Sequence, residues 1–208
     1  MKYLTEKIEF PDVEASSRDG LLAIGGDLSI ERLLLAYRSG IFPWYNCDEP
    51  ILWWSPDPRF VLFPDKVKVS KSLNTILRKK VYHITTNFDF DTVINACAKV
   101  KRKGQSGTWI TDDMINAYTT LHKLGYAKSV EVWEEKELVA GFYGIDLNNG
   151  IFCGESMFTT KSNASKVGFI SFLQETKYDL IDCQVHTEHF ERLGGEFISR
   201  KDFIHKLN

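Results

Sequence analysis

The chain has 208 residues, 43% of them hydrophobic and 26% charged, a composition typical of a folded globular protein with one large or two small domains. No apolar run approaches the roughly 18 residues that a membrane-spanning helix requires. The opening MKYLTEKIEF lacks the apolar core of a secretion signal. The four cysteines form no C-x-x-C pair, which argues against a zinc ribbon or a thioredoxin-type site. We therefore expect reduced thiols in a cytoplasmic protein.

Charge is unevenly distributed along the chain. Between Lys66 and Lys103 there are ten Lys or Arg and two Asp, a net charge of +8, so the rest of the chain carries −10 to reach the total of −2. A segment of this kind is equally consistent with a solvated face and with a binding site for a polyanion. Binding to phosphates would weaken as salt rises.

Helices are predicted from periodicity and capping residues. Asp27 or Ser29 can cap a helix at about residues 29–38, after which Gly40 suits a left-handed C-terminal position. The remaining helices are expected over 71–80, over 89–100, between a Thr111 cap and Gly125, over 164–176 after an Asn163 cap, near 186–193, and at the C-terminus.

Strands are predicted at 81–86, 128–134 and 137–146, in the segments IFCGESMF and LIDCQV, and near 196–199. Pro56 and Pro58 exclude a central strand or helix at their own positions. Hairpin strands followed by alternating helices and strands indicate an α+β protein with a mixed sheet.

Three tryptophans lie close together in the first part of the chain. Trp44, Trp53 and Trp54 flank a turn and precede two prolines. They favour a satellite hydrophobic cluster on composition alone, and the alternative is an aromatic platform on which a base or another ring stacks.

Few generic catalytic motifs occur. The chain has no phosphate-binding glycine loop, no H-E-x-x-H and no G-x-S-x-G. Asp182, Cys183, His186 and His189 contain metal-ligating groups, but their positions on a strand that runs into a helix argue against convergence on one ion.

Two polar spots lie in otherwise apolar strands. Glu155 occurs in GESMF, and Asp182 and Gln184 occur in LIDCQV, where strand alternation would allow their side chains to hydrogen-bond. A buried carboxylate needs a partner. Asp182 could be a structural acid that holds loop amides, and Glu155 could be the buried partner of an arginine; catalysis is the alternative for both.

Several segments together resemble the leucyl/phenylalanyl-tRNA–protein transferase family. They are GLLAIGGDLSIERLLLAYRSGIFPWY, ILWWSPDPR, GTWI, AYTTLHKLGYAKSVEVW, LVAGFYG, FCGESMF, NASK and LIDCQV, in family order from about residue 10 to about residue 200.

The resemblance implies an aminoacyltransferase. Such enzymes transfer Leu or Phe, and less well Met, from aminoacyl-tRNA to the α-amino group of proteins that begin with Arg or Lys, which marks these proteins for N-end rule degradation. The implied fold is a small N-terminal domain, here 1–62, and a GNAT-like acyltransferase domain, here 63–208. No metal, coenzyme, DNA or membrane is implied, and we expect a monomer.

The resemblance also implies residue roles. Gln184 would accept a hydrogen bond from the attacking amine, Asp182 would hold the Gln184 amide, and Glu155 would bind an ammonium group. The expected aminoacyl pocket consists of Phe142, Phe152, Met157, Phe169, Phe172 and Ile181. The residues expected at the terminal adenosine are Trp44 and Trp109, and those expected on a tRNA-binding helix are Lys71, Arg78, Lys79 and Lys80.

Some positions depart from the family pattern, and two rival functions remain. Phe142 stands where methionine can occur, and Asn74 and Thr75 stand where relatives can be basic. One rival is an acetyl-CoA-dependent N-acetyltransferase, although FTTKSNASKVG lacks the glycine pattern that holds pyrophosphate at a helix N-terminus. The other rival is a non-catalytic RNA-binding module.

Overall fold

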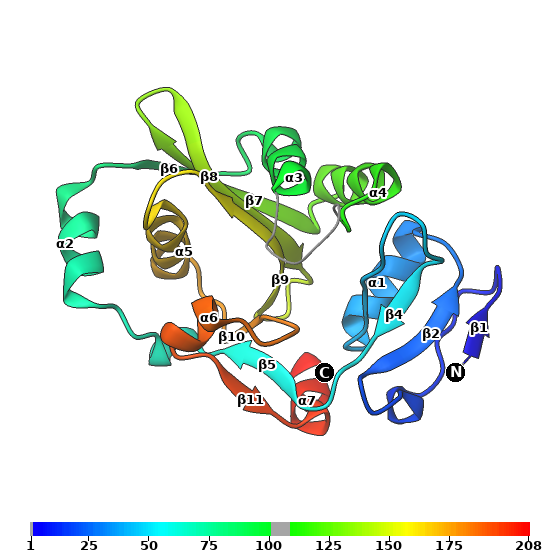
Figure 1. Cartoon of the computed structure of the whole chain (residues 1–208). Helices are drawn as coiled ribbons and strands as arrows, with labels where there is room; N and C mark the ends of the chain where they lie inside the picture. The colour runs from blue at the N-terminus through cyan, green and yellow to red at the C-terminus, as the bar shows by residue number, and fades with distance from the viewer. Residues whose placement is uncertain (1, 101–108) are drawn as a thin grey trace.

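The computed structural model describes residues 2–100 and 109–208, which form two β-sheets with helices packed on them (Figure 1). The smaller sheet has the strand order β1-β2-β4-β3; β1 and β2 run parallel, and the other neighbours run antiparallel. The elements of this N-terminal part are β1 (Lys2–Leu4), η1 (Val13–Ala15), β2 (Leu21–Gly25), α1 (Ile30–Arg38), β3 (Phe42–Pro43) and β4 (Leu52–Trp54).

The larger sheet has seven strands in the order β11-β5-β10-β9-β8-β7-β6. Its neighbours are antiparallel except β9 and β10, which run parallel. The strands are β5 (Arg59–Leu62), β6 (His83–Thr86), β7 (Ala127–Glu134), β8 (Glu137–Asp146), β9 (Ile151–Thr159), β10 (Leu180–Asp182) and β11 (Glu196–Ile198). The short β10 therefore pairs the LID segment with residues 151–153 of β9, directly before the GES segment.

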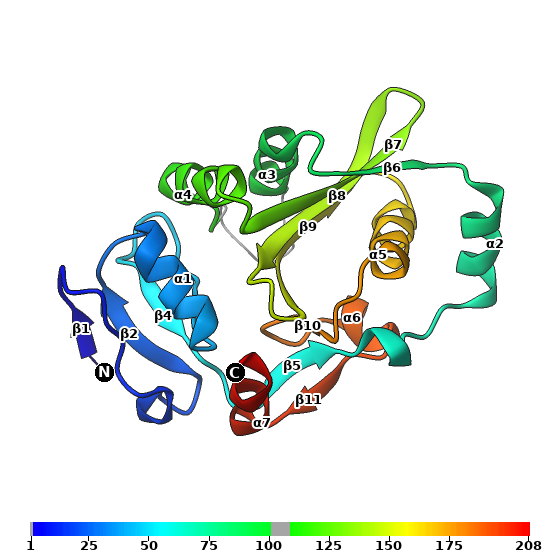
Figure 2. The same ribbon diagram turned by 180° about the vertical axis from the view of Figure 1, so that it is seen from behind.

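Successive residues of β8 mark the two faces of this sheet. The ring of Phe142 lies 5.8 Å from that of Phe169 on α5, whereas the ring of Tyr143 lies 5.7 Å from that of Phe90 on α3. The helices α3 and α4 thus cover one face and α5 covers the other (Figures 1 and 2). The helices of this part are η2 (Pro64–Lys66), α2 (Lys71–Lys79), α3 (Phe90–Lys99), α4 (Asp112–Lys123), α5 (Ala164–Glu175), α6 (Glu188–Arg192) and α7 (Arg200–Leu207).

The C-terminal helix α7 lies at the junction of the two sheets (Figure 1). The Arg200 guanidinium donates to the Ser55 carbonyl at 2.8 Å and pairs with Glu14 at 3.0 Å. The Arg200 main-chain N–H donates to Asp57 at 3.0 Å. One residue of α7 therefore connects the N-terminal part to the segment that crosses into the larger sheet.

Most predicted elements are observed with bounds shifted by a few residues. Thr111 caps α4 by accepting from the Met114 N–H. The expected side-chain cap at Asn163 is wrong, because Asn163 makes no capping bond and has a left-handed main chain instead. Of the two candidates before α1, Ser29 makes no capping side-chain bond, and Asp27 accepts from the Ser29 main-chain N–H at 2.8 Å. The predicted strand LIDCQV ends at Asp182.

The change from one sheet to the other occurs between β4 and β5, that is, within residues 55–58. This segment contains Pro56 and Pro58 and belongs to no strand or helix, as predicted. The division of the chain into two domains after residue 62 stays a prediction. The strand β5, which lies just before that position, pairs within the larger sheet. None of the helices within the described ranges has the length and apolar character that a bilayer crossing requires.

Gly40 offers a stability test of the junction. It has a φ of +72°, and a β-carbon there would meet the side chains of Ile204, Phe203 and Leu207 on α7. Gly125 has a φ of +85° and no atom within 4 Å of such a β-carbon. We expect Gly125→Ala to lower the free energy of unfolding by about 1 kcal/mol and Gly40→Ala by about 2–3 kcal/mol in denaturant titrations. Equal losses would show that α7 does not pack tightly on Gly40.

Candidate active site

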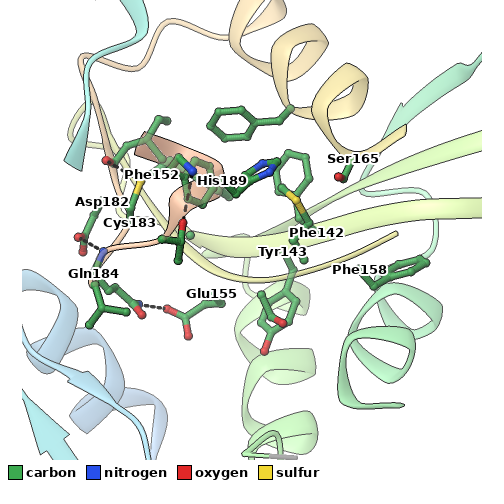
Figure 3. Close-up of a pocket in the computed structure, with 18 of the residues that line it drawn as sticks. Phe142, Tyr143, Phe152, Glu155, Phe158, Ser165, Asp182, Cys183, Gln184 and His189 are labelled. Carbon is green, nitrogen blue, oxygen red and sulfur yellow. Dashed lines mark hydrogen bonds between the residues drawn. The ribbon is translucent and has the colours of Figure 1, made fainter. Parts of the chain in front are cut away.

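A cavity of about 520 Å³ lies where the N-terminal part meets the larger sheet (Figure 3). The N-terminal part contributes Phe42, Pro43 and Trp44, and the larger sheet contributes residues of β8, β9 and β10. Residues of α5 and α6 complete the wall. Neither sheet alone encloses the cavity.

One end of the cavity is apolar. The expected pocket residues that line it are Phe142, Phe152, Met157, Phe169 and Ile181. Phe172 does not line it and packs behind the wall, with ring centroids 5.4 Å from Phe142 and 5.0 Å from Phe152. Edge-to-face contacts of this kind fix the ring positions. The result is a rigid apolar recess.

Trp44 and Trp109 line the same cavity. Trp44 is held by Trp54, whose indole N–H donates to the Trp44 carbonyl at 2.7 Å and whose ring lies 5.8 Å away. Trp44 is nevertheless 38% exposed, so part of its ring is open to a ligand. Trp53, in contrast, is fully buried and donates to the Gly25 carbonyl. Of the three clustered tryptophans, Trp53 therefore belongs to the core, Trp44 lines the cavity, and Trp54 supports Trp44.

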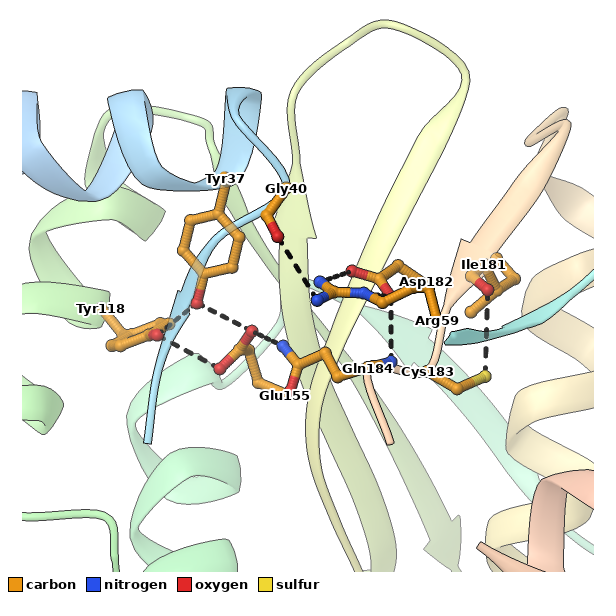
Figure 4. Close-up of polar contacts among 9 residues, drawn as sticks. All are labelled: Tyr37, Gly40, Arg59, Tyr118, Glu155, Ile181, Asp182, Cys183 and Gln184. Carbon is orange, nitrogen blue, oxygen red and sulfur yellow. Dashed lines mark hydrogen bonds and ion pairs between the residues drawn. The ribbon is translucent and has the colours of Figure 1, made fainter. Parts of the chain in front are cut away.

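Asp182 forms a buried, two-point ion pair with Arg59 (Figure 4). The Arg59 Nε donates to Oδ1 at 2.8 Å and Nη2 donates to Oδ2 at 2.6 Å. Both residues are at most 1% exposed, and the guanidinium lies over the rings of Phe42 and Phe203 at 4.6 and 4.7 Å. Sequence reasoning missed Arg59; a lone arginine before the apolar FVLF run was the available signal.

Gln184 is oriented by two acidic residues that contact different parts of it. Its main-chain N–H donates to Asp182 Oδ1 at 2.9 Å, and its side-chain Nε2 donates to Glu155 Oε1 at 2.7 Å. The expected bond between the Asp182 and Gln184 side chains is therefore replaced by a main-chain bond. The reason is that the strand ends at Asp182 and Gln184 has a φ of +62°, so strand alternation does not apply.

Glu155 contacts two tyrosines from other elements (Figure 4). The Tyr37 hydroxyl of α1 lies 2.8 Å from Oε1, and the Tyr118 hydroxyl of α4 lies 3.1 Å from Oε2. Burial raises the pKa of Glu155 to about 8, although the tyrosines and Gln184 act in the opposite direction. Sequence reasoning assigned no functional role to either tyrosine.

The residues with metal-ligating groups near β10 do not converge on one point. Asp182 is paired with Arg59, and the His186 ring nitrogen lies 3.1 Å from Glu191. Cys183 and His189 line the cavity. Within residues 2–100 and 109–208 no three His, Cys, Asp or Glu side chains are arranged to hold a metal ion. None of the four cysteines, all of which lie in the described residues, forms a disulfide.

The expected tRNA-binding residues lie on α2 or at its end, away from the cavity. Lys71, Arg78, Lys79 and Lys80 are all exposed, and Figure 2 shows α2 on the far side of α5 from the sheet. The other end of the basic segment, residues 101–103, lies outside the described residues.

Family models match both parts of the chain. The leucyl/phenylalanyl-tRNA protein transferase model matches residues 61–208, and the model of its N-terminal domain matches residues 26–57. The chain belongs to the leucyl/phenylalanyl-tRNA–protein transferase family. It is accordingly an enzyme of the aminoacyltransferase class, and the expected α+β class with an N-terminal family domain is confirmed.

Curated relatives extend over nearly the whole chain. A leucyl/phenylalanyl-tRNA–protein transferase of Flavobacterium johnsoniae is 55% identical over 98% of this chain and 97% of its own length. One from Syntrophus aciditrophicus is 55% identical over 96% of this chain and 84% of its own length.

Two solved structures show a remote likeness to this chain. L-PGS from Bacillus licheniformis is 13% identical, with a TM-score of 0.43 over 89% of this chain and 63% of that chain. A GCN5-related N-acetyltransferase from Kribbella flavida is 9% identical, with a TM-score of 0.39 over 78% of this chain and 58% of that chain.

The Arg59–Asp182 pair yields a second stability test. Arg59→Met leaves the Asp182 carboxylate buried without its cation, so we expect the free energy of unfolding to fall by about 3–5 kcal/mol. Arg192 forms a matched surface pair with Glu188, both more than 70% exposed, and Arg192→Met should cost less than about 1 kcal/mol. Chemical denaturation measures both. A loss below about 1 kcal/mol for Arg59→Met would contradict the buried pair.

Proposed function

We propose that this enzyme transfers Leu or Phe, and less well Met, from aminoacyl-tRNA to the α-amino group of proteins that begin with Arg or Lys. One observation carries the proposal: a single cavity joins an apolar recess, the Glu155–Gln184 pair and two tryptophans. These parts correspond to the three features of the donor, namely its side chain, its ester and its terminal base. Family membership supports the same assignment.

The reaction needs alignment more than strong acid–base chemistry. The donor ester is already activated, and an α-amine has an ordinary pKa of ~7.7–8.0, so a fair fraction is neutral near pH 7.5. We infer that the Gln184 carbonyl oxygen accepts a hydrogen bond from this amine as it attacks the ester carbon. As the new C–N bond forms, the bond between the carbonyl carbon and the ribose oxygen breaks. The proton that the amine loses is balanced by the proton that the departing ribose hydroxyl gains. An activated ester requires no coenzyme.

Asp182 and Glu155 have distinct roles in this proposal. Asp182 acts through the main chain of Gln184, whose N–H it accepts, and Arg59 keeps that carboxylate in place. Glu155 accepts from the Gln184 amide and adjoins the same cavity, where an amine of the acceptor or the donor would meet it. Both residues position the group that contacts the amine.

The apolar recess accounts for donor choice. Aromatic and aliphatic walls exclude charged side chains, because a buried charge would lack a partner. Among apolar side chains, such a recess discriminates by only ~1–3 kcal/mol per methylene, which fits acceptance of Leu, Phe and Met together. Phe142 stands at its wall, so the Leu-to-Phe ratio depends on this residue.

The remaining parts of the site suit a tRNA. Stacking of a base on an aromatic ring contributes ~1–3 kcal/mol, and we infer that Trp44 and Trp109 hold the terminal adenosine in this way. The basic residues of α2 would contact phosphates of the tRNA body. We further propose a monomeric, cytoplasmic enzyme that acts in N-end rule degradation, with neither DNA nor a membrane as partner.

The deciding experiment supplies the purified protein with radiolabelled Leu-tRNA or Phe-tRNA and a peptide that begins with Arg, Lys or Met. Label is expected on the Arg and Lys peptides and not on the Met peptide. Binding of tRNA without transfer would favour the RNA-binding module, and acetylation of the peptides with acetyl-CoA would favour the acetyltransferase.

Gln184→Asn tests the role of the amide. Asparagine adopts a left-handed main chain readily and keeps an amide, but it is one methylene too short to reach Glu155. We expect transfer to fall about 10²-fold or more, with tRNA affinity and thermal stability nearly unchanged. If tRNA affinity falls in parallel, Gln184 contributes to docking of the donor instead.

The double variant Lys79→Gln, Lys80→Asn tests α2. Asparagine suits position 80, where φ is +49°. We expect weaker tRNA binding and a salt slope that is flatter by ~0.7–0.9 for each phosphate that the variant no longer neutralises. The control is Lys2→Gln, Lys7→Gln, which removes two exposed lysines from the N-terminal strand region. If tRNA affinity has the same salt dependence in both double variants, the basic residues of α2 form a solvated face that does not bind tRNA.

A further inference from the structure

A closed ring of contacts joins the side chains of Tyr37, Tyr118 and Glu155 (Figure 4). The Tyr37 hydroxyl contacts Glu155 Oε1 at 2.8 Å, the Tyr118 hydroxyl contacts Oε2 at 3.1 Å, and the two hydroxyls contact each other. Tyr37 is 2% exposed and Tyr118 is fully buried, so bulk water does not reach the two hydroxyls, whereas Glu155 also lines the cavity. Neither tyrosine lines the cavity itself.

The number of protons in this ring decides the state of Glu155. Each of the three contacts joins two oxygens and needs one proton to be a hydrogen bond. The two phenols supply only two of these three protons. With an ionised carboxylate, one contact would join two oxygens without a proton between them. With a neutral carboxylic acid, every contact is a hydrogen bond: Glu155 Oε2 donates to Tyr118, Tyr118 donates to Tyr37, and Tyr37 donates to Oε1.

The surroundings also favour the neutral acid. Burial, and to a smaller extent the negative charge of Asp182, raise the pKa of Glu155 to about 8. The Cys153 thiol faces Glu155 along the sheet, and burial keeps the pKa of this thiol well above its ordinary value. Arg59 is engaged by Asp182 through two bonds, and Tyr143 packs edge-on against Tyr118.

The ring determines which end of the Gln184 amide faces Glu155. Because the acid proton is held by Tyr118, Oε1 of Glu155 can only accept, and the amide must present its NH₂ group there, as it does at 2.7 Å. The amide carbonyl oxygen then points away from Glu155. An amide has nearly the same shape in both orientations, so only hydrogen bonds choose between them.

We propose that Tyr37 and Tyr118 are positioning residues: by taking up the proton of Glu155, they hold the Gln184 amide with its carbonyl oxygen free for the attacking amine. The inference rests on the proposed role of Gln184. If the acid proton were free, it could donate to the Gln184 carbonyl and turn the NH₂ group toward the amine. Two N–H donors would then face each other and the amine would be misaligned.

The first test compares Tyr118→Phe with wild type across about pH 6.5 to about pH 9.5, in short single-turnover reactions with one donor and one Arg peptide. Titration of the peptide amine cancels in the ratio of the two rates. At low pH the variant has a free acid proton, and we expect about fivefold slower transfer. At high pH Glu155 is ionised and can only accept, so the ratio should recover to within about twofold.

Glu155→Gln supplies the second test, because glutamine mimics the neutral acid. Its NH₂ group can donate to Tyr118 while its carbonyl accepts from Tyr37 and Gln184. We expect Glu155→Gln to lower transfer by less than about 100-fold, because the ring of hydrogen bonds and the orientation of the Gln184 amide are kept. In the double variant Glu155→Gln, Tyr118→Phe, nothing ionises at position 155, so the pH-dependent recovery should disappear.

Tyr178→Phe is the matched control. It removes a phenol that contacts a carboxylate outside the ring, donating to that of Asp146 at 2.7 Å, and its activity ratio to wild type should not vary with pH. A flat ratio for Tyr118→Phe, or a correctly folded Glu155→Gln whose transfer falls more than about 100-fold, would overturn the inference.

Neutron diffraction of the deuterated wild-type protein at about pH 6.5 tests the ring without any transfer assay. Three deuterons among Tyr37, Tyr118 and Glu155, with the ND₂ group of Gln184 toward Glu155, are expected. Two deuterons, or the amide oxygen toward Glu155, would refute the ring even in an active enzyme. Absence of transfer with the expected deuterons would refute only the proposed function.

Discussion

The Arg59–Asp182 ion pair is the interaction on which the site depends. Arg59 lies on β5, just after the segment that links the two sheets, and its guanidinium also donates to the Gly40 carbonyl at 3.3 Å. The same guanidinium lies between Phe42 of the small sheet and Phe203 of α7. Asp182, fixed in this way, accepts the N–H of Gln184. One cation thereby joins both sheets, the C-terminal helix and the main chain of Gln184.

A buried ion pair often contributes little net stability, because removing two charges from water offsets their attraction. Its value here is geometric. A two-point contact between guanidinium and carboxylate allows little rotation, so the main chain at 182–184 has one position relative to the small sheet. Tyr37, which belongs to the same N-terminal part as that sheet, consequently meets Glu155 at a defined distance.

The sequence predicts local structure well where the signal is local. Thr111 and Gly125 bound α4, and the Asn148–Gly150 turn separates β8 from β9, because capping and turn preferences act over a few residues. Motifs also locate Glu155 and Gln184 in one cavity. The sequence does not predict the partners of the site residues. Arg59 and Asp182, for example, are 123 positions apart, and their contact follows from the antiparallel pairing of β5 with β10.

Tyrosine hydroxyls are equally hidden from sequence reasoning. Tyr37 and Tyr118 occupy apolar helix faces, and a pattern of apolar spacing does not reveal that two such faces converge on one carboxyl. The left-handed main chain at Gln184 is also unexpected, since an apolar run such as LIDCQV reads as continuous strand. Tertiary contacts to Asp182 and Glu155 override that local preference.

The left-handed main chain at Gln184 lowers stability, whereas we propose that the side chain at this position serves activity. A side chain with a β-carbon is strained in this conformation by ~1 kcal/mol or more, whereas glycine adopts it freely. Glycine, however, has no amide, and asparagine has one that is too short. Selection for thermal resistance alone would therefore favour glycine at position 184 and yield a more stable protein without the amide that we propose aligns the attacking amine.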